Sequence, residues 1–225
     1  MENLLEENKI HFERKNLNNN YSGYILYSKN LGELEDFWLE DLKQYKLYNK
    51  CSELKETAAF RYLYYQELTN NLKHEKLIII MMNPSLANST TLDPTIKNIN
   101  RYLEQKNYRS FEIVNLHHIR TPKPAHLQSY LKKHSNSDYQ DILKNYIEQN
   151  KNKKDCKIVA AWGGNYHKVA LGILQKMKLN YEEDFYAYAL NKEKDPRHFS
   201  NLAYNKKDKY NDFKKIKDII TDLDV

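Results

Sequence analysis

Short apolar runs recur along the chain from residue 58 onward. Lys76–Met82 is unbroken and rich in β-branched residues, which is typical of a strand buried on both faces. Phe111–Leu116 and Lys157–Ala161 have the same character and predict two more strands. Ala59–Leu68 has strand composition, and Phe185–Leu190 is a last strand candidate. The pattern predicts a sheet with Lys76–Met82 at its centre.

Helical spacing of apolar residues fills the segments between these runs. Asp93-Pro94 provides an N-cap and a proline at the first helical position, which predicts a helix over Pro94–Gln105. Further helices are expected over Tyr139–Gln149, after Trp162-Gly163-Gly164 with the stripe Tyr166, Val169, Ala170, Ile173, Leu174 and Met177, and over Asp208–Thr221. This alternation predicts an α/β fold with a mostly parallel sheet and helices on both faces.

Residues 1–57 differ from the rest and are interpreted as an N-terminal α+β appendage. Two short strand candidates, Ile10–Arg14 and Tyr24–Ser28, flank an asparagine-rich loop. Glu33–Leu47 has apolar residues at helical spacing on an acidic surface, which predicts an amphipathic helix. We therefore divide the chain into this appendage and a main α/β domain over residues 58–225.

The charge of the chain is unevenly distributed. The net charge is +6, and residues 1–57 carry −3 while residues 58–225 carry +9. A basic domain in a chain with 19 tyrosines suits DNA or a nucleotide, because lysines neutralise phosphates and aromatic rings stack on bases. The alternative is compositional drift toward Lys, Asn and Tyr. No apolar run approaches the roughly 18 residues of a membrane span, so we expect a cytoplasmic protein without membrane contact.

The two cysteines, Cys51 and Cys156, have no Cys-x-x-Cys spacing and no nearby histidine pair. This excludes a cysteine-held metal cluster, and we interpret both as reduced thiols. We expect no cofactor.

Polar residues follow the central predicted strand directly. Asn83, Pro84 and Ser85 place an amide, a rigid proline and a hydroxyl at its exit. Ligands of parallel α/β sheets bind beyond the carboxyl ends of the strands, so we interpret this tip as the centre of a candidate site. An ordinary Asn-Pro turn is the alternative. Asp93 closes the same loop, although helix capping alone explains it.

The next strand ends in Asn115, whose amide could hydrogen-bond both a donor and an acceptor on the edge of a nucleobase. Satisfaction of loose backbone groups is the alternative. His117, His118 and Arg120 follow, and strand alternation directs one of the two histidines toward the site. No carboxylates are arranged with these histidines, so we expect no metal there.

Two later loops complete the candidate site. Trp162-Gly163-Gly164 could let an anionic ligand approach a helix N-terminus, or could serve only tight packing. In the loop Pro196–Ser200, Arg197 and His198 place a cation beside an imidazole that could stabilise developing negative charge. A solvated loop histidine is the ordinary explanation. No Gly-x-Ser-x-Gly elbow is present, which disfavours acyl-enzyme chemistry.

Several short motifs follow one another in the main domain. They are Arg61-Tyr62-Leu63, Met82-Asn83-Pro84-Ser85, Ala87, Asp93-Pro94-Thr95, Asn115-Leu116, Arg120-Thr121, Trp162-Gly163 and Pro196-Arg197-His198. Over about residues 58–205 their order resembles the domain-of-unknown-function family 1643. That family in turn resembles the uracil-DNA glycosylase superfamily, which implies a three-layer α/β/α sandwich with its site at the strand ends.

The second resemblance implies roles for individual residues. Asn83-Pro84 is similar to the Asn form of a Gly-x-Asp/Asn-Pro motif that positions the attacking water, without its glycine. Asn115 is similar to a strand-terminal asparagine that reads the base, and Trp162-Gly163 to a Trp-Gly after a later strand. His198-Phe199-Ser200 corresponds to a His-Pro-Ser whose histidine stabilises the departing base, with phenylalanine in place of proline. Asp93 has no counterpart in the superfamily's familiar members.

The leading hypothesis is a DNA glycosylase-like enzyme, a hydrolase of the N-glycosidic bond of a damaged or modified base. The alternative is a nucleotide- or nucleic-acid-binding protein of the same fold without catalysis, in phage defence or modified-base metabolism. The catalytic candidates are Asn83, His198 and Asp93, and the ligand-binding candidates are Pro84, Ser85, Asn115, Trp162, Gly163, Arg120 and Arg197. We expect Asn83, Asn115, Trp162 and His198 to surround one pocket.

Overall fold

The computed structural model describes only part of the chain. The described residues are 10–16, 21–28, 60–68, 75–84, 94–119, 127–128, 131–132, 137–201 and 212–223. The predicted amphipathic helix Glu33–Leu47 lies outside these residues, as does the predicted boundary between residues 57 and 58. Both stay predictions.

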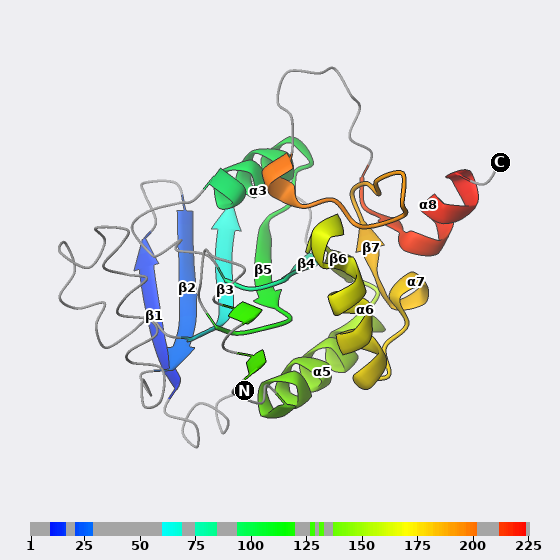
Figure 1. Ribbon diagram of the computed structural model, residues 1–225. Coiled ribbons are helices and arrows are strands. Elements are labelled where there is room, and N and C mark those ends of the chain that lie inside the picture. Colours follow the sequence, from blue (N-terminus) through cyan, green and yellow to red (C-terminus); the bar gives the residue numbers. More distant parts are fainter. Residues whose placement is uncertain are drawn as a thin grey trace.

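Eight strands among the described residues form one sheet in the order β1-β2-β3-β5-β4-β6-β7-β8 (Figure 1). The strands are β1 Ile10–Asn16, β2 Tyr21–Ser28, β3 Phe60–Leu68, β4 Lys76–Met81, β5 Ser110–Asn115, β6 Cys156–Ala160, β7 Tyr186–Ala187 and β8 Lys214–Lys215. The four central strands β5, β4, β6 and β7 are parallel to one another. The pairings that flank them are antiparallel. The predicted parallel centre is confirmed.

The predicted N-terminal strands are confirmed and belong to the same sheet. β1 pairs with β2 and β2 with β3, in both cases antiparallel. Through β3 these two strands continue the sheet that holds β4 and β5.

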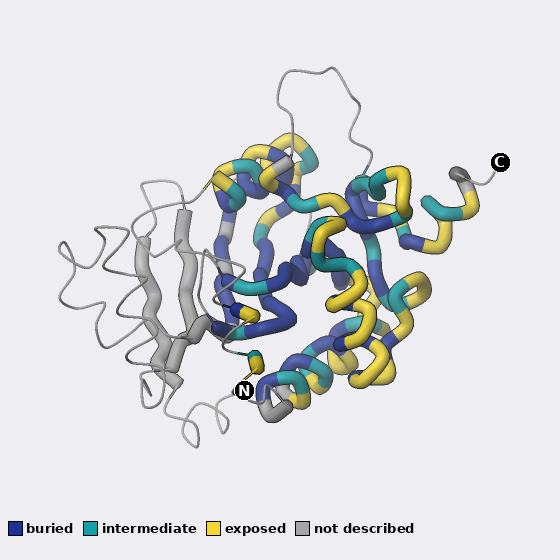
Figure 2. The backbone as a smooth tube through the Cα atoms, viewed as in Figure 1, coloured by how far each residue is buried: buried dark blue, intermediate teal, exposed yellow. Residues whose placement is uncertain are grey.

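Helices cover both faces of the sheet, as predicted. They are α3 Pro94–Gln105, α5 Ser137–Lys151, α6 His167–Lys176, α7 Tyr181–Asp184 and α8 Ile216–Leu223, with short 3-10 helices at Gly164–Tyr166 and Phe199–Asn201. β4 is buried along both faces, because its odd-numbered residues pack under α3 and its even-numbered residues under α5 and α6. Figure 2 shows the buried strands between the partly exposed helices. None of the described helices is long and apolar enough to cross a membrane.

The end of the chain differs from the prediction of a helix over Asp208–Thr221. Lys214–Lys215 forms β8 against β7, and the helix begins only at Ile216. Phe213 packs in the core on the α3 side of the sheet, whereas Ile216 packs on the α5 and α6 side. Phe213 and Ile216 are spaced like residues on one face of a helix, but one helical face cannot pack on both sides of a sheet.

Two other predicted elements are shorter than expected. The candidate strand Phe185–Leu190 reduces to β7 and an isolated bridge between Leu190 and Pro196. The helix after Trp162 begins with the 3-10 turn Gly164–Tyr166, so α6 starts at His167 and Val169 is 49% exposed rather than buried.

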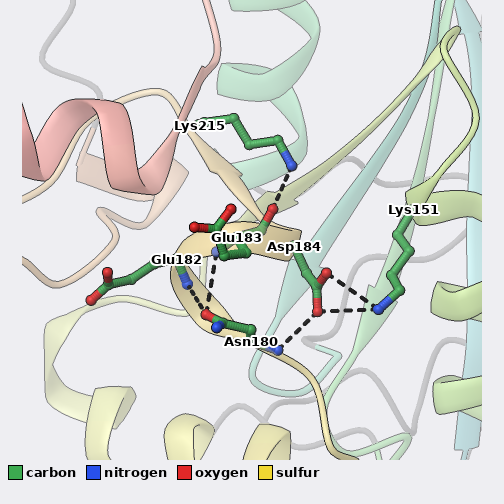
Figure 3. Close-up of polar contacts among 6 residues, drawn as sticks. All are labelled: Lys151, Asn180, Glu182, Glu183, Asp184 and Lys215. Atoms are coloured by element: carbon green, nitrogen blue, oxygen red, sulfur yellow. Dashed lines mark hydrogen bonds and ion pairs between the residues drawn. The ribbon is translucent and has the colours of Figure 1, made fainter.

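Polar contacts join α5, α7 and β8 (Figure 3). Asn180 caps α7, because its Oδ1 accepts from the backbone N–H of Glu183 and of the preceding residue. Asp184 accepts from Lys151 at the end of α5, with Nζ 3.2 Å from Oδ1. Lys215 of β8 donates to the backbone carbonyl of Glu183. These contacts fix the short strands β7 and β8 at the edge of the sheet.

Candidate functional site

The carboxyl ends of the central strands meet at one edge of the sheet. Asn115 at the end of β5 lies in register with Met81 at the end of β4. The N–H of Leu116 donates to the carbonyl of Met81 across 2.8 Å, and the N–H of Ala161 donates to that of Ile80 across 2.9 Å. The segments that follow β4, β5 and β6 therefore leave the sheet side by side.

Asn115 is the most deeply buried polar residue of this edge, with an exposed fraction of 0%. It follows Phe111 and Ile113 on the α3 side of the sheet. Neither Nδ2 nor Oδ1 has a hydrogen-bond partner among the described residues, although the backbone carbonyl accepts from Tyr139. A buried polar group left unsatisfied costs about 1–3 kcal/mol, so this amide can gain by binding a ligand that offers both a donor and an acceptor.

Asn83 and Pro84 lie just beyond β4. Asn83 is half-buried, and its Nδ2 donates to the carbonyl of Pro84 across 3.1 Å. Pro84 is buried. The other two candidates of this loop, Ser85 and Asp93, lie outside the described residues, and α3 begins at Pro94 as predicted.

The two glycines after Trp162 are required by a close approach of the late loop. Gly163 has φ 83°, a conformation that side chains rarely adopt, and a Cβ there would lie 3.3 Å from Cβ of His198. A Cβ at Gly164 would lie 2.9 Å from Oδ2 of Asp195. The structure thus brings Gly163 and His198 together. It also places the carboxylate of Asp195, and not an open anion position, against Gly164.

The side chain of Trp162 lies on the other side of the sheet from Asn115. It is 1% exposed and belongs to the core under α5 and α6, with its ring against Tyr181 and Phe185. The indole therefore does not join Asn115 on the α3 side. The backbone exit after Trp162 is the part of the Trp-Gly motif that meets His198.

The half-buried His198 has a fixed ring orientation. Its Nδ1 accepts from the backbone N–H of Ser200 across 3.1 Å and lies 2.8 Å from the hydroxyl of Ser200. A backbone N–H can only donate, so Nδ1 carries a lone pair and the proton of the neutral ring sits on Nε2. Neutral His198 therefore presents an N–H donor at Nε2.

Phe199 anchors this loop in the core on the α3 side of the sheet. Its side chain is fully buried against Tyr102 of α3 and Tyr188, and its carbonyl accepts from Asn98 of α3 across 3.0 Å. The phenylalanine that stands where the resemblance implies proline thus serves as an apolar anchor.

Arg197 is exposed, and its backbone N–H donates to the carbonyl of Ala189 across 3.1 Å. Arg120, the other predicted cation, lies outside the described residues.

The histidines after Asn115 do not form a metal site in the described part of the chain, where no group of three His, Cys, Asp or Glu side chains is arranged around a cation position. His117 is buried, and this burial lowers its pKa to about 4, so the ring is neutral near pH 7. His118 stacks on Tyr139 with ring centroids 4.3 Å apart. Burial raises the pKa of the Cys156 thiol to about 11, which makes it a poor nucleophile.

Asp195 and His167, which lie next to the glycine turn, were not predicted from the sequence. Asp195 is a buried carboxylate, and its Oδ1 lies 3.6 Å from Nε2 of His167. Nδ1 of His167 accepts from the indole N–H of Trp162 across 3.3 Å. The Asp-Pro dipeptide just before Arg197 and His198 was the available signal for Asp195. No periodicity marked His167.

The fold and this edge define an α/β protein with polar residues at the carboxyl ends of the parallel central strands of a mixed sheet. The chain belongs to the family described as "Protein of unknown function (DUF1643)", whose sequence pattern matches residues 61–198. No curated protein and no solved structure gives a significant match.

Proposed function

We propose that this chain is a DNA glycosylase-like enzyme that hydrolyses the N-glycosidic bond of a damaged or modified base. One observation carries the proposal. Among the described residues, the fully buried amide of Asn115 has an unbonded donor and an unbonded acceptor, at the sheet edge where neutral His198 carries its proton on Nε2. A protein tolerates such an amide when a ligand completes its hydrogen bonds.

The three layers of the fold support this proposal. Helices cover both faces of a parallel central sheet, and the polar residues follow β4, β5, β6 and β7. This is the arrangement that resemblance to the uracil-DNA glycosylase superfamily implies. The Gly163 contact with His198 joins two of the four motifs of that resemblance.

The chemistry follows from the residues that meet there. A glycosylase takes its target nucleotide out of the stack and holds the base by its edge, a task for Asn115. When the glycosidic bond breaks, the base leaves with negative charge, and the Nε2–H of His198 donates to it. A single donor aimed at developing charge contributes about 10²–10³-fold in rate. The nearby phosphates of the DNA stabilise the positive charge on the sugar.

Asn83 holds the attacking water in this proposal. An amide cannot take the proton from water as a carboxylate can, so the C1′–N bond breaks first, water then adds to C1′, and the proton of the water passes to the departed base anion or to solvent. The reaction therefore depends on a base that departs easily. This requirement favours damaged or modified bases as substrates. The net charge of +9 on residues 58–225 and the exposed Arg197 suit the DNA backbone.

The alternative is a nucleotide- or nucleic-acid-binding protein of the same fold that does not catalyse. Asn83 favours this alternative, because an amide side chain can act neither as a general acid nor as a general base. Its Nδ2 donates to the carbonyl of the adjacent Pro84. Asn115 would read the base in either case.

Incubation with a DNA panel separates the two functions. The panel holds uracil, oxidised and alkylated bases, and phage DNA with hypermodified bases, and the product measured is an alkali-labile abasic site. The glycosylase proposal predicts abasic sites with at least one member. DNA binding without abasic product from any member would replace it with the binding protein.

A further inference from the structure

The loop that carries His198 is closed by a buried carboxylate that the proposed chemistry does not use. Asp195 is 7% exposed. Its Oδ2 accepts from Nδ2 of Asn191 across 3.0 Å, and its backbone N–H donates to Oδ1 of Asn191 across 2.8 Å. The N–H of Asn191 donates back to the carbonyl of Asp195 across 2.9 Å. These reciprocal bonds close residues 191–195 into a rigid turn directly before His198.

Asp195 and His198 meet two successive glycines of the turn after β6. The Cβ position of Gly164 lies 2.9 Å from Oδ2 of Asp195, and that of Gly163 lies 3.3 Å from Cβ of His198. These two contacts fix the position and the direction of the late loop against the turn. Displacement of Asp195 from Gly164 should therefore also displace His198 from Gly163.

His167 lies between Asp195 and the buried indole of Trp162. The indole N–H of Trp162 donates to Nδ1 of His167, so the ring proton lies on Nε2, which faces Oδ1 of Asp195 at 3.6 Å. Trp162 is buried in the core under α5 and α6 and cannot move freely. Burial lowers the pKa of His167, and the carboxylate of Asp195 opposes this effect.

We propose that Asp195 is a positioning residue that holds His198 at the candidate site, through Asn191 within the loop and through its contact with Gly164 on the turn after β6. This inference rests on the proposed function for its consequence in catalysis, because His198 acts there as the donor to the departing base. The placement of the His198 ring is a property of the free protein and can be measured without a substrate.

The test compares three variants of the full chain by ring ¹⁵N NMR of His198, with the signals assigned by their loss in His198→Ala. Asp195→Ala removes the carboxylate. Gly164→Ala leaves the carboxylate but displaces it, because the added methyl meets its oxygen. Asp184→Ala is the matched control, since it breaks the ion pair with Lys151 of α5 but leaves the hydroxyl of Tyr181 on α7 to donate to the carbonyl of Lys194 in the late loop.

In the unsubstituted protein, neutral His198 should show one unprotonated nitrogen at Nδ1 and one protonated nitrogen at Nε2. Asp195→Ala and Gly164→Ala should move both signals toward the average of the two tautomers, while Asp184→Ala should leave them unchanged. On a substrate found with the DNA panel, Asp195→Ala should lower kcat about 10²-fold with KM for DNA unchanged.

Unchanged His198 signals in Gly164→Ala would overturn the positioning role of Asp195. If Asp195→Ala does not fold, Gly164→Ala alone provides the test. Loss of excision in Asp184→Ala equal to that in Asp195→Ala would overturn it as well, because the effect would then be one of stability. If no variant excises any base but the His198 signals respond as expected, the positioning role stands and the proposed function fails.

Discussion

The backbone N–H of Ser200 donates to Nδ1 of His198 across 3.1 Å, and this bond sets where the ring proton lies. His198 accepts as the residue directly before the 3-10 helix Phe199–Asn201, so the ring is oriented by the start of that helix. A neutral histidine held in this tautomer carries its ring proton on Nε2.

Replacement of Asn115 by an apolar residue should stabilise the protein and abolish base recognition. Asn115→Leu keeps the number and branching of the side-chain heavy atoms and removes an amide that has no hydrogen-bond partner among the described residues, so the free energy of unfolding should rise by about 1–3 kcal/mol. Excision or base binding should be lost. Urea unfolding and the DNA panel measure the two effects.

Asn150 provides the matched control for this substitution. It is also buried, but its Nδ2 donates to the carbonyl of Tyr146 across 2.7 Å, and its Oδ1 accepts from Lys153. Asn150→Leu should therefore lower stability. If Asn115→Leu proved as destabilising as Asn150→Leu, the amide of Asn115 would have a structural role instead.

Gly163→Ala should impair both stability and the proposed activity. The residue would have to adopt φ 83°, and its Cβ would press on Cβ of His198 from 3.3 Å. Backbone strain of this kind costs about 1–3 kcal/mol, measured by urea unfolding. Gly172 lies within α6 with nothing within 4 Å of its Cβ position, so Gly172→Ala should raise the free energy of unfolding by about 0.5–1 kcal/mol. Equal effects of the two substitutions would contradict the close approach.

The protein should lose stability as the pH falls from about 6.5 to 4, in part because of His117. Burial lowers the pKa of His117 to about 4 in the folded state, below the unfolded value of 6.5. Below pH 6.5 the unfolded chain binds a proton that the folded protein does not, so this loss accumulates until the folded pKa is reached. It should amount to about 3 kcal/mol.

Urea unfolding across this pH range measures the effect, with His117→Gln as the comparison. The variant should show a smaller loss between pH 6.5 and 4. A stability curve with the same slope in both proteins would mean that His117 is not held neutral by burial.

Much of the fold was predictable because its elements have strong local signals. The unbroken apolar run of β4 and the Asp-Pro start of α3 were each sufficient to place the element, and α3 has its predicted bounds. The closing helix was misplaced because Phe213 and Ile216 have helical spacing yet enter different layers. That choice depends on the sheet, which no local pattern shows.

The candidate site was predictable only in its strand ends. The position of Asn115 follows from where β5 stops, and the structure confirms that end. The contact of Asp195 with Gly164 joins segments distant in sequence, and it depends on how the late loop folds back onto β6. The Trp162 side chain was predicted to face the site. It instead lies on the same side of the sheet as Ala160, the last residue of β6, in the core under α5 and α6.

The most direct test of the account is single-turnover base excision by His198→Ala beside the unsubstituted protein, on the substrate that the DNA panel identifies. The account predicts a rate lower by about 10²-fold or more with DNA binding unchanged, because a directed donor to the departing base is lost. An excision rate that survives the substitution would contradict the central role of His198.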